Sequence, residues 1–196
     1  MVGAYAAPKK KFDPDAIVRC MLINDTRGIT GNGHLGVVLV DESGYGNFYC
    51  YRRRGMYKIQ FTPGQLQQFM KDGLPHKQSL FHFDRMIEWN ITAEEGRRMY
   101  DCAETTQFKE FHRHASFWAS VWPVKYDNCL TVARAVLTAG SRKYSFLYPF
   151  GQPNYVFYTM RMRLLLRFTP YNVYYIDGPK PEIPEDYDPL DPSTLD

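Results

Sequence analysis

Two segments joined by a short glycine-containing turn constrain the fold most strongly. Residues 34–41 read HLGVVLVD, residues 47–53 read NFYCYRR, and ESGYG lies between them. β-branched and aromatic residues favour strands, the second segment alternates, and the connection has the chemistry of a hairpin turn. The two segments therefore predict a β-hairpin in an antiparallel sheet, with His34 at the mouth of its first strand.

The other periodic segments predict further strands and four helices. Strands are expected at 16–25, 79–90 and 171–176, and helices at 62–73, 92–104 and 153–168, with a further apolar helix that begins at Cys129 and stops at Gly140. Thr62 before a proline, and Thr92 with Glu95, are residues typical of helix starts, and Gly140 is expected to be a C-terminal stop. The expected fold is α+β, a mostly antiparallel sheet packed against helices, without internal repeats.

The two ends of the chain differ in composition from its centre. Residues 9–11 place lysines after a very short apolar patch, the reverse of a secretory signal, so a product made in the cytoplasm without a signal peptide is expected. Residues 177–196 contain seven acidic residues and one lysine, a charge of −6, which leaves +9 on the rest of a chain of net charge +3. Together with its prolines, this charge predicts an extended or disordered tail after a single domain at 1–176.

The distribution of basic and apolar residues argues against two classes of partner. Basic residues are scattered apart from YRRRG at 51–55 and MRMRLLLR at 160–167, whereas a nucleic-acid interface needs basic residues clustered on one element with aromatics between them. No apolar run reaches the roughly 18 residues that a membrane-spanning helix requires. We therefore expect no nucleic-acid partner and no stable membrane insertion.

The cysteines and histidines show no metal-binding spacing. The four cysteines are far apart and form no CxxC pair, so neither a paired-cysteine zinc site nor a disulfide framework is expected. His112 and His114 form an i, i+2 pair, but no carboxylate or cysteine accompanies them at ligand spacing. We therefore expect neither a metal nor a cofactor.

Cys129 follows Asp127 and Asn128 at the start of a predicted apolar helix. Unsatisfied N–H groups and the positive end of the helix dipole favour a thiolate there, and the same N–H groups can receive an oxyanion. A small residue packed at a helix start is the alternative interpretation. A catalytic thiol also requires an imidazole that accepts and returns its proton.

Among five histidines, His34 is the candidate for that imidazole. It follows GNG, where the backbone can approach closely, and begins the most regular strand of the chain. His76 is expected on a surface loop, and His82 alternates within a predicted strand and equally suits a core position. The residues alone thus pair Cys129 with His34 as a hypothesis.

At this point the sequence resembles a known family. GHLGVVLVD at 33–41, ITAEEGRRM at 91–99 and YDNCLTVARAVLTAG at 126–140 resemble the circularly permuted papain-like cysteine hydrolases of the NlpC/P60 superfamily, which includes lecithin–retinol acyltransferase-like proteins. In these proteins the histidine strand precedes the cysteine helix. The resemblance covers roughly residues 17–140 and implies a permuted papain-like catalytic domain.

The resemblance also implies catalytic roles. Cys129 would be the nucleophile and its backbone N–H part of the oxyanion hole, while His34 would be the general base and then the acid. The third member usually lies on the strand after the histidine strand, but NFYCYRR has no His, Glu or Asp. Tyr51 is our candidate, Asn47 the next, and a dyad or a Tyr51 that only packs on the sheet are alternatives.

Members of this superfamily cleave or transfer acyl groups, and short members without a signal peptide are often antibacterial effectors delivered by type VI secretion. The resemblance therefore implies amide hydrolysis in peptidoglycan peptides in the periplasm of a target cell, with an immunity protein and a secretion apparatus as partners. One alternative is a phospholipase or acyltransferase, because residues 156–168 are basic and apolar enough to lie on an anionic bilayer, although a core-facing helix also fits them. The other alternative is a catalytically silent protein-binding module.

Overall fold

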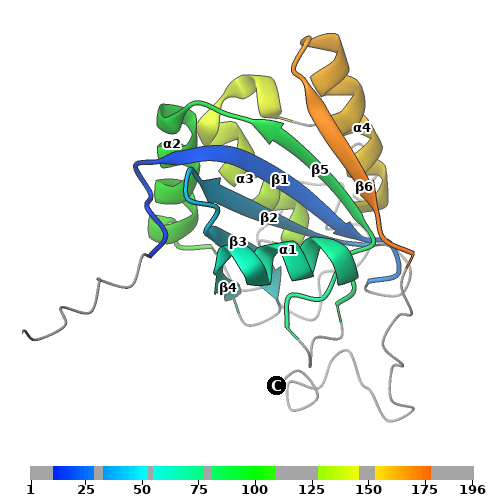
Figure 1. Ribbon diagram of the computed structural model, residues 1–196. Coiled ribbons are helices and arrows are strands. Elements are labelled where there is room, and N and C mark those ends of the chain that lie inside the picture. Colours follow the sequence, from blue (N-terminus) through cyan, green and yellow to red (C-terminus); the bar gives the residue numbers. More distant parts are fainter. Residues whose placement is uncertain are drawn as a thin grey trace, which may run out of the picture.

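A six-stranded antiparallel sheet forms the centre of the protein (Figure 1). The computed structural model describes residues 11–28, 33–52, 55–76, 81–108, 128–145 and 153–177. Within them the strands are β1 Ile17–Asp25, β2 His34–Asp41, β3 Gly46–Arg52, β4 Gly55–Phe61, β5 Arg85–Asn90 and β6 Tyr171–Tyr175, in the spatial order β4-β3-β2-β1-β5-β6. Every neighbouring pair is antiparallel, so the predicted α+β class is confirmed.

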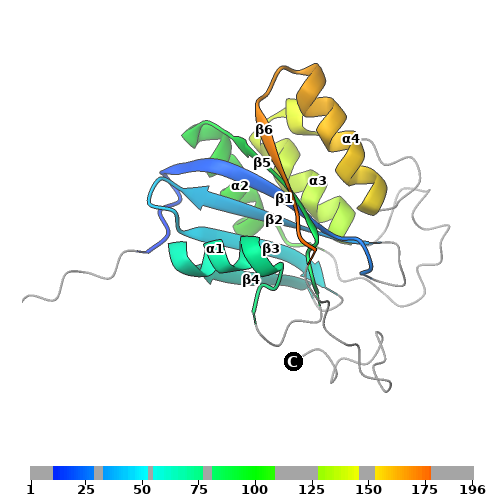
Figure 2. The same ribbon diagram turned by 45° about the vertical axis from the view of Figure 1, so that its right-hand side comes forward.

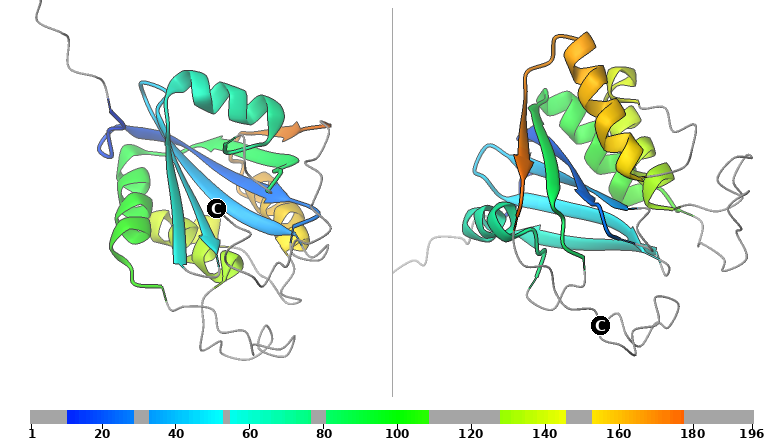
Figure 3. Two further views of the ribbon diagram at one scale, coloured as in Figure 1. Left: turned by 90° about the horizontal axis from the view of Figure 1, so that it is seen from below. Right: turned by 90° about the vertical axis from the view of Figure 1, so that its right-hand side faces the viewer.

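The helices cover the two faces of the sheet unequally. They are α1 Pro63–Asp72, α2 Ala93–Thr105, α3 Cys129–Gly140 and α4 Pro153–Leu166, with a short 3₁₀ helix, η2, at Arg142–Tyr144. Figure 3 shows α1 on one face and α2, α3 and α4 on the other. We call these the α1 face and the three-helix face.

Alternation along the strands divides the core between these faces. On β2, Leu35, Val37 and Leu39 belong to the cluster on the three-helix face, whereas Val38 and Val40 belong to the cluster on the α1 face. Successive side chains of a strand point to opposite faces, so each strand supplies both clusters. The parity of a residue number on a strand therefore decides which side of the molecule its side chain occupies.

Local sequence determines most helix boundaries. Thr62 and Thr92 each form a capping box with the residue three positions on, as predicted, and Gly73 ends α1 in the left-handed conformation with φ 72°. The expected stop at Gly140 is wrong, because Gly140 is the last helical residue and Ser141 the cap, with extended backbone. A Cβ at Gly140 would lie 2.7 Å from Cγ of Met99, so this glycine permits close contact between α2 and α3.

The strand β4 was not predicted from the sequence. It pairs antiparallel with β3, and its side chains are mostly half-buried or exposed. An edge strand without a continuous buried face gives a weak alternation signal. The predicted tail at 177–196 lies outside the described residues except for Asp177, which is exposed.

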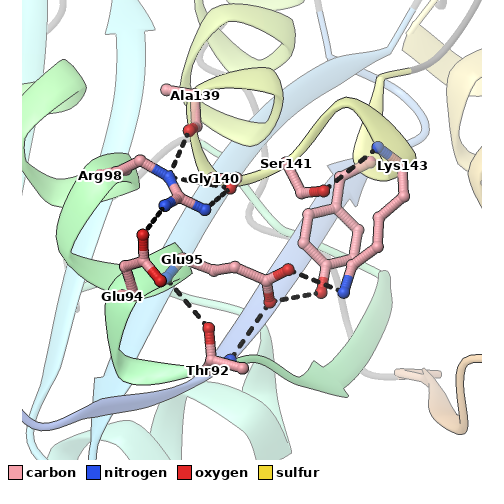
Figure 4. Close-up of polar contacts among 9 residues, drawn as sticks. Thr92, Glu94, Glu95, Arg98, Ala139, Gly140, Ser141 and Lys143 are labelled. Atoms are coloured by element: carbon pink, nitrogen blue, oxygen red, sulfur yellow. Dashed lines mark hydrogen bonds and ion pairs between the residues drawn. The ribbon is translucent and has the colours of Figure 1, made fainter.

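Charged and polar side chains fasten α2 to the end of α3 (Figure 4). Glu95 accepts a hydrogen bond from the Tyr144 hydroxyl at 2.9 Å and forms an ion pair with Lys143 at 2.7 Å. Arg98 donates to the carbonyl of Gly140 at 2.6 Å. These contacts hold the helix that begins with Cys129 against the rest of the three-helix face.

Candidate functional site

Cys129 is the first residue of α3, on the three-helix face. The Asn128 side chain caps the helix by accepting from the N–H groups of Leu130 at 2.9 Å and Thr131 at 3.0 Å. The Thr131 hydroxyl in turn accepts from the Asn128 N–H at 2.8 Å. The Asn-Cys pair thus begins a well-capped helix, and Cys129 is 8% exposed.

The electrostatic environment of Cys129 does not favour a thiolate. Burial raises the pKa of its thiol to about 11, although backbone N–H groups of Leu35, Leu130 and Cys129 itself donate to the sulfur and lower the pKa. Desolvation of the charged form outweighs the stabilisation at the helix terminus. Contrary to the expectation from the helix start alone, the thiol is protonated at neutral pH.

Alkylation rates measure this protonation directly. We predict that the rate of carbamidomethylation of Cys129 by iodoacetamide rises about tenfold per pH unit between pH 7 and pH 10, because only the thiolate reacts. Cys102, which is half-buried and lies in α2, is the comparison thiol and should react faster at neutral pH. Peptide mass spectrometry after timed quenching resolves the two sites, and a rate for Cys129 that levels off below pH 8 would contradict the raised pKa.

His34 lies on the α1 face, so the structure does not bring its ring to the thiol of Cys129. The imidazole stacks on Phe81 with ring centroids 4.5 Å apart and lies 6.2 Å from the ring of Phe83. Cys129 instead packs in the opposite cluster with Leu35, the residue after His34. The predicted Cys129–His34 pair therefore requires correction, since strand alternation places the two groups on opposite sides of the sheet.

The thiol that His34 contacts is that of Cys50. Nε2 of His34 lies 2.6 Å from Sγ of Cys50, and both residues are 1% exposed. Gly36 is the direct partner of Cys50 across β2 and β3, which makes His34 its diagonal neighbour on the same face. A cysteine and a histidine from adjacent strands thus form a direct thiol–imidazole contact.

An acidic residue occupies the next strand along. Asp25 on β1 is the direct cross-strand partner of His34, so both side chains share the α1 face. Its carboxylate accepts from the N–H groups of Arg27 at 3.0 Å and Gly28 at 3.1 Å, and the residue is 4% exposed. Three adjacent strands therefore present Asp25, His34 and Cys50 in a row.

The predicted third member, Tyr51, lies on the three-helix face. Its ring packs edge-on to Phe108 at 6.2 Å, in the same cluster as Cys129 and away from His34. The second candidate, Asn47, donates to the Tyr49 hydroxyl at 3.2 Å. Both residues lie on the three-helix face, so neither can orient the imidazole of His34 on the α1 face.

The other histidines do not add to the site. The ring of His76 lies 6.2 Å from that of Tyr57, and His82 is 2% exposed, while His112 and His114 lie outside the described residues. Across the described ranges no three His, Cys, Asp or Glu side chains are grouped as metal ligands.

The contact between Cys50 and His34 could have been predicted from the length of the hairpin turn. The turn at 42–45 fixes the register of the hairpin, and the pairing of Gly36 with Cys50 follows from counting outward from that turn. Comparison of the chain with family models, with curated proteins and with solved structures yields no match.

Proposed function

We propose that the protein is a cysteine hydrolase in which Cys50 is the nucleophile and His34 the general base. The single observation that supports this is the 2.6 Å contact between the thiol sulfur and the imidazole. Asp25, directly opposite His34, would stabilise the imidazolium that forms. A base within hydrogen-bond reach of a thiol is the arrangement that nucleophilic acyl transfer requires.

The proposed hydrolysis proceeds in two steps, acylation of Cys50 and hydrolysis of the resulting thioester. The sulfur of Cys50 attacks a substrate carbonyl carbon while its proton passes to His34, and collapse of the tetrahedral intermediate expels the leaving group, which takes that proton. Water then attacks the thioester carbonyl carbon and gives a proton to His34. The carboxylic acid product leaves, and His34 returns the proton to the sulfur of Cys50. The N–H groups at the start of α3 serve Cys129 on the opposite face and do not act as an oxyanion hole for Cys50.

Access to the sulfur depends on Phe81. The Phe81 ring covers the imidazole at 22° from parallel and is only half-buried, whereas Phe83 beneath it is fully buried. A substrate carbonyl reaches Cys50 when the Phe81 side chain moves aside. Phe81→Ala should therefore increase the rate at which iodoacetamide modifies Cys50 in the folded protein.

The permuted papain-like fold and the peptidoglycan substrate belong to the proposal through the sequence resemblance. In its support, the sheet is antiparallel and the helix beginning at Cys129 packs on it. Against a simple transfer of roles, His34 and Cys129 occupy opposite faces. We therefore propose amide bonds of cell-wall peptides as the first substrate class and an antibacterial effector role as its setting.

A second substrate class, lipid acyl esters, is favoured by one observation. The helix α4 exposes Met162, Leu165 and Leu166 beside arginines, a surface that suits contact with lipid. None of the helices in the part of the chain that the structure describes has the length and hydropathy of a membrane span.

Product analysis with matched variants tests the proposal. Peptidoglycan fragments and phospholipid vesicles are each incubated with wild type, Cys50→Ser, His34→Asn and Cys129→Ser, and products are identified by mass spectrometry. We expect loss of hydrolysis in Cys50→Ser and His34→Asn and retention in Cys129→Ser, with circular dichroism confirming folding.

The reverse pattern would assign the nucleophile to Cys129 and overturn the proposed pair. Absence of any product from either substrate with folded wild type would favour a silent binding module instead.

A further inference from the structure

Exposed apolar side chains are concentrated in one part of the molecule. Seven large hydrophobic side chains are exposed in the described residues, and all of them lie on α4, on β6 or in the turn between these elements: Tyr155, Tyr158, Met162, Leu165, Leu166, Phe168 and Tyr175. We call this set the α4–β6 surface. Scattered exposed hydrophobic residues are ordinary, but their confinement to one helix and the strand beside it marks an interaction site.

The helix α4 is apolar on both of its faces. Val156, Phe157, Met160 and Leu164 are buried against the three-helix face. The exposed residues follow a second stripe with a spacing of three and four positions, so they lie along the outer side of the same helix. One helix thus supplies both a core face and an outward apolar face.

Exposure rises towards the turn that follows α4. The exposed fraction is 43% at Tyr155, 55% at Met162, 71% at Leu166 and 94% at Phe168. Phe168 has a positive φ of 51°, and its N–H donates to the carbonyl of Leu165 at 3.0 Å. Figure 2 shows the α4–β6 turn standing clear of the other elements, so a hydrogen-bonded turn holds an aromatic ring in solvent at a projecting tip.

The charged side chains of α4, of β6 and of the turn between them are all basic. Residues 153–176 contain no Asp or Glu, and they include Arg161, Arg163 and Arg167. Arg161 donates to the Tyr175 hydroxyl at 2.9 Å, and Arg85 from β5 donates to the Tyr158 hydroxyl at 2.5 Å. The guanidinium groups of Arg161 and Arg85 therefore lie beside the apolar stripe. Arg163 instead donates to the backbone carbonyls of Lys143 at 3.0 Å and Arg142 at 3.3 Å.

From these features we infer that the α4–β6 surface binds the surface of an anionic lipid bilayer. Leu166 and Phe168 enter the boundary between headgroups and acyl chains, where projecting apolar groups are stabilised. The tyrosines lie at the level of the headgroups, where amphipathic rings are favoured. Arg161 and Arg167 contact lipid phosphates, and the absence of carboxylates from residues 153–176 avoids repulsion from an anionic leaflet.

Charge and shape distinguish the bilayer from a second copy of the chain. A two-fold contact brings the same surface together with itself, so it would bury arginines without an acidic residue of 153–176 to pair with them. A protein interface also has its most buried anchors near its centre, whereas here the most exposed side chains lie at a projecting end. An anionic bilayer can neutralise the arginines and can deform around the projecting apolar turn.

The inference is independent of the proposed thiol chemistry and is tested without turnover. Full-length protein is sedimented with sucrose-loaded vesicles of phosphatidylcholine alone or with 30 mol% phosphatidylglycerol, roughly the anionic content that produces a strong surface potential. We expect binding to the anionic vesicles that weakens with added salt. Cys50→Ser should bind as wild type does, which separates this result from any failure of the hydrolase proposal.

Matched variants locate the contact. Phe168→Ser and Leu166→Ser should each reduce partitioning about tenfold, and Arg167→Glu should reduce it at least fivefold. Lys71→Glu makes the same charge change on α1, at the opposite face, and should have a much smaller effect.

Three results would overturn the inference. One is no binding to either vesicle, and another is binding that all three α4–β6 variants leave intact. The third is a dimer in light scattering that Phe168→Ser dissociates, because that would identify a second copy as the occupant.

Discussion

Replacing Glu95 by alanine is expected to lower the free energy of unfolding by about 2–4 kcal/mol, whereas the same change at Glu94 lowers it by less than about 0.5 kcal/mol. The two glutamates are neighbours in the first turn of α2 and both form ion pairs. Their side chains differ in burial, at 11% exposed for Glu95 and 82% for Glu94. The difference between the two variants in free energy of unfolding therefore measures the buried contacts of Glu95, apart from any general effect of an acidic residue at a helix start.

Glu95 satisfies three donors at once. It accepts from the Thr92 N–H at 3.2 Å, from the Tyr144 hydroxyl and from the Lys143 ammonium (Figure 4). Tyr144 is 1% exposed, so without Glu95 its hydroxyl loses its acceptor away from water, which costs about 1–3 kcal/mol. Loss of the capping box at Thr92 adds about 1 kcal/mol. Burial raises the pKa of Tyr144 to about 12, so the hydroxyl remains a donor at all ordinary pH values.

The contribution of Glu95 depends on pH in a defined direction. Burial alone would raise the pKa of Glu95, but hydrogen bonds from Lys143, Thr92 and Tyr144 outweigh it and lower the pKa from its usual value. A carboxyl whose pKa is lower in the folded than in the unfolded state stabilises the fold above the unfolded pKa, about 4.3 for Glu, and loses this contribution as the pH falls through the folded pKa. The difference between wild type and Glu95→Gln should therefore be full at pH 6 to 8 and should shrink below about pH 4.3.

Urea denaturation followed by circular dichroism measures these quantities. Equal destabilisation by Glu94→Ala and Glu95→Ala would show that the network among Glu95, Lys143 and Tyr144 contributes no more than a surface ion pair. A difference between wild type and Glu95→Gln that persists unchanged at pH 3 would contradict the role of the charged form.

Gly96→Ala is expected to destabilise the protein by about 1–3 kcal/mol, while Gly64→Ala raises the free energy of unfolding by up to about 1 kcal/mol. A Cβ at Gly96 would lie 2.6 Å from both Cβ and Cγ2 of Ile17 and 3.0 Å from its carbonyl oxygen. A Cβ at Gly64, in the first turn of α1, would meet nothing within 4 Å. Ile17 is β-branched and fully buried, so it cannot turn away, and α2 must move off the sheet.

The same glycine-to-alanine change thus has opposite signs in two helices. Helix propensity favours alanine at both positions, and only the contact with Ile17 reverses the effect at Gly96. Urea denaturation of the two variants measures the signs. A stabilised Gly96→Ala variant would mean that α2 packs more loosely on β1 than the structure shows.

Local chemistry in the sequence determined most of the helices and strands. The hairpin turn at 42–45 gives β2 the bounds His34–Asp41 as expected, and the threonine capping boxes give the starts of α1 and α2. These features depend on residues within one turn or one hairpin, so they can be predicted without tertiary contacts. The clustering of basic and apolar residues in α4 was also visible, but not that its outer stripe remains uncovered.

Tertiary structure alone decided which thiol His34 contacts and whether Cys129 ionises. The resemblance placed His34 and Cys129 in one site, but the register of β1, β2 and β3 turns the imidazole towards Cys50 and Asp25 instead. A shift of one residue along a strand moves its side chains to the opposite face of the sheet. The motif around His34 contains residues of both faces, so it does not show on which face the helix that begins at Cys129 packs. The helix start at Cys129 was readable from Asn128, but the charge of its thiol depends on burial by side chains from other elements. Local patterns therefore determined where most helices and strands lie, and packing across the sheet determined which side chains can react.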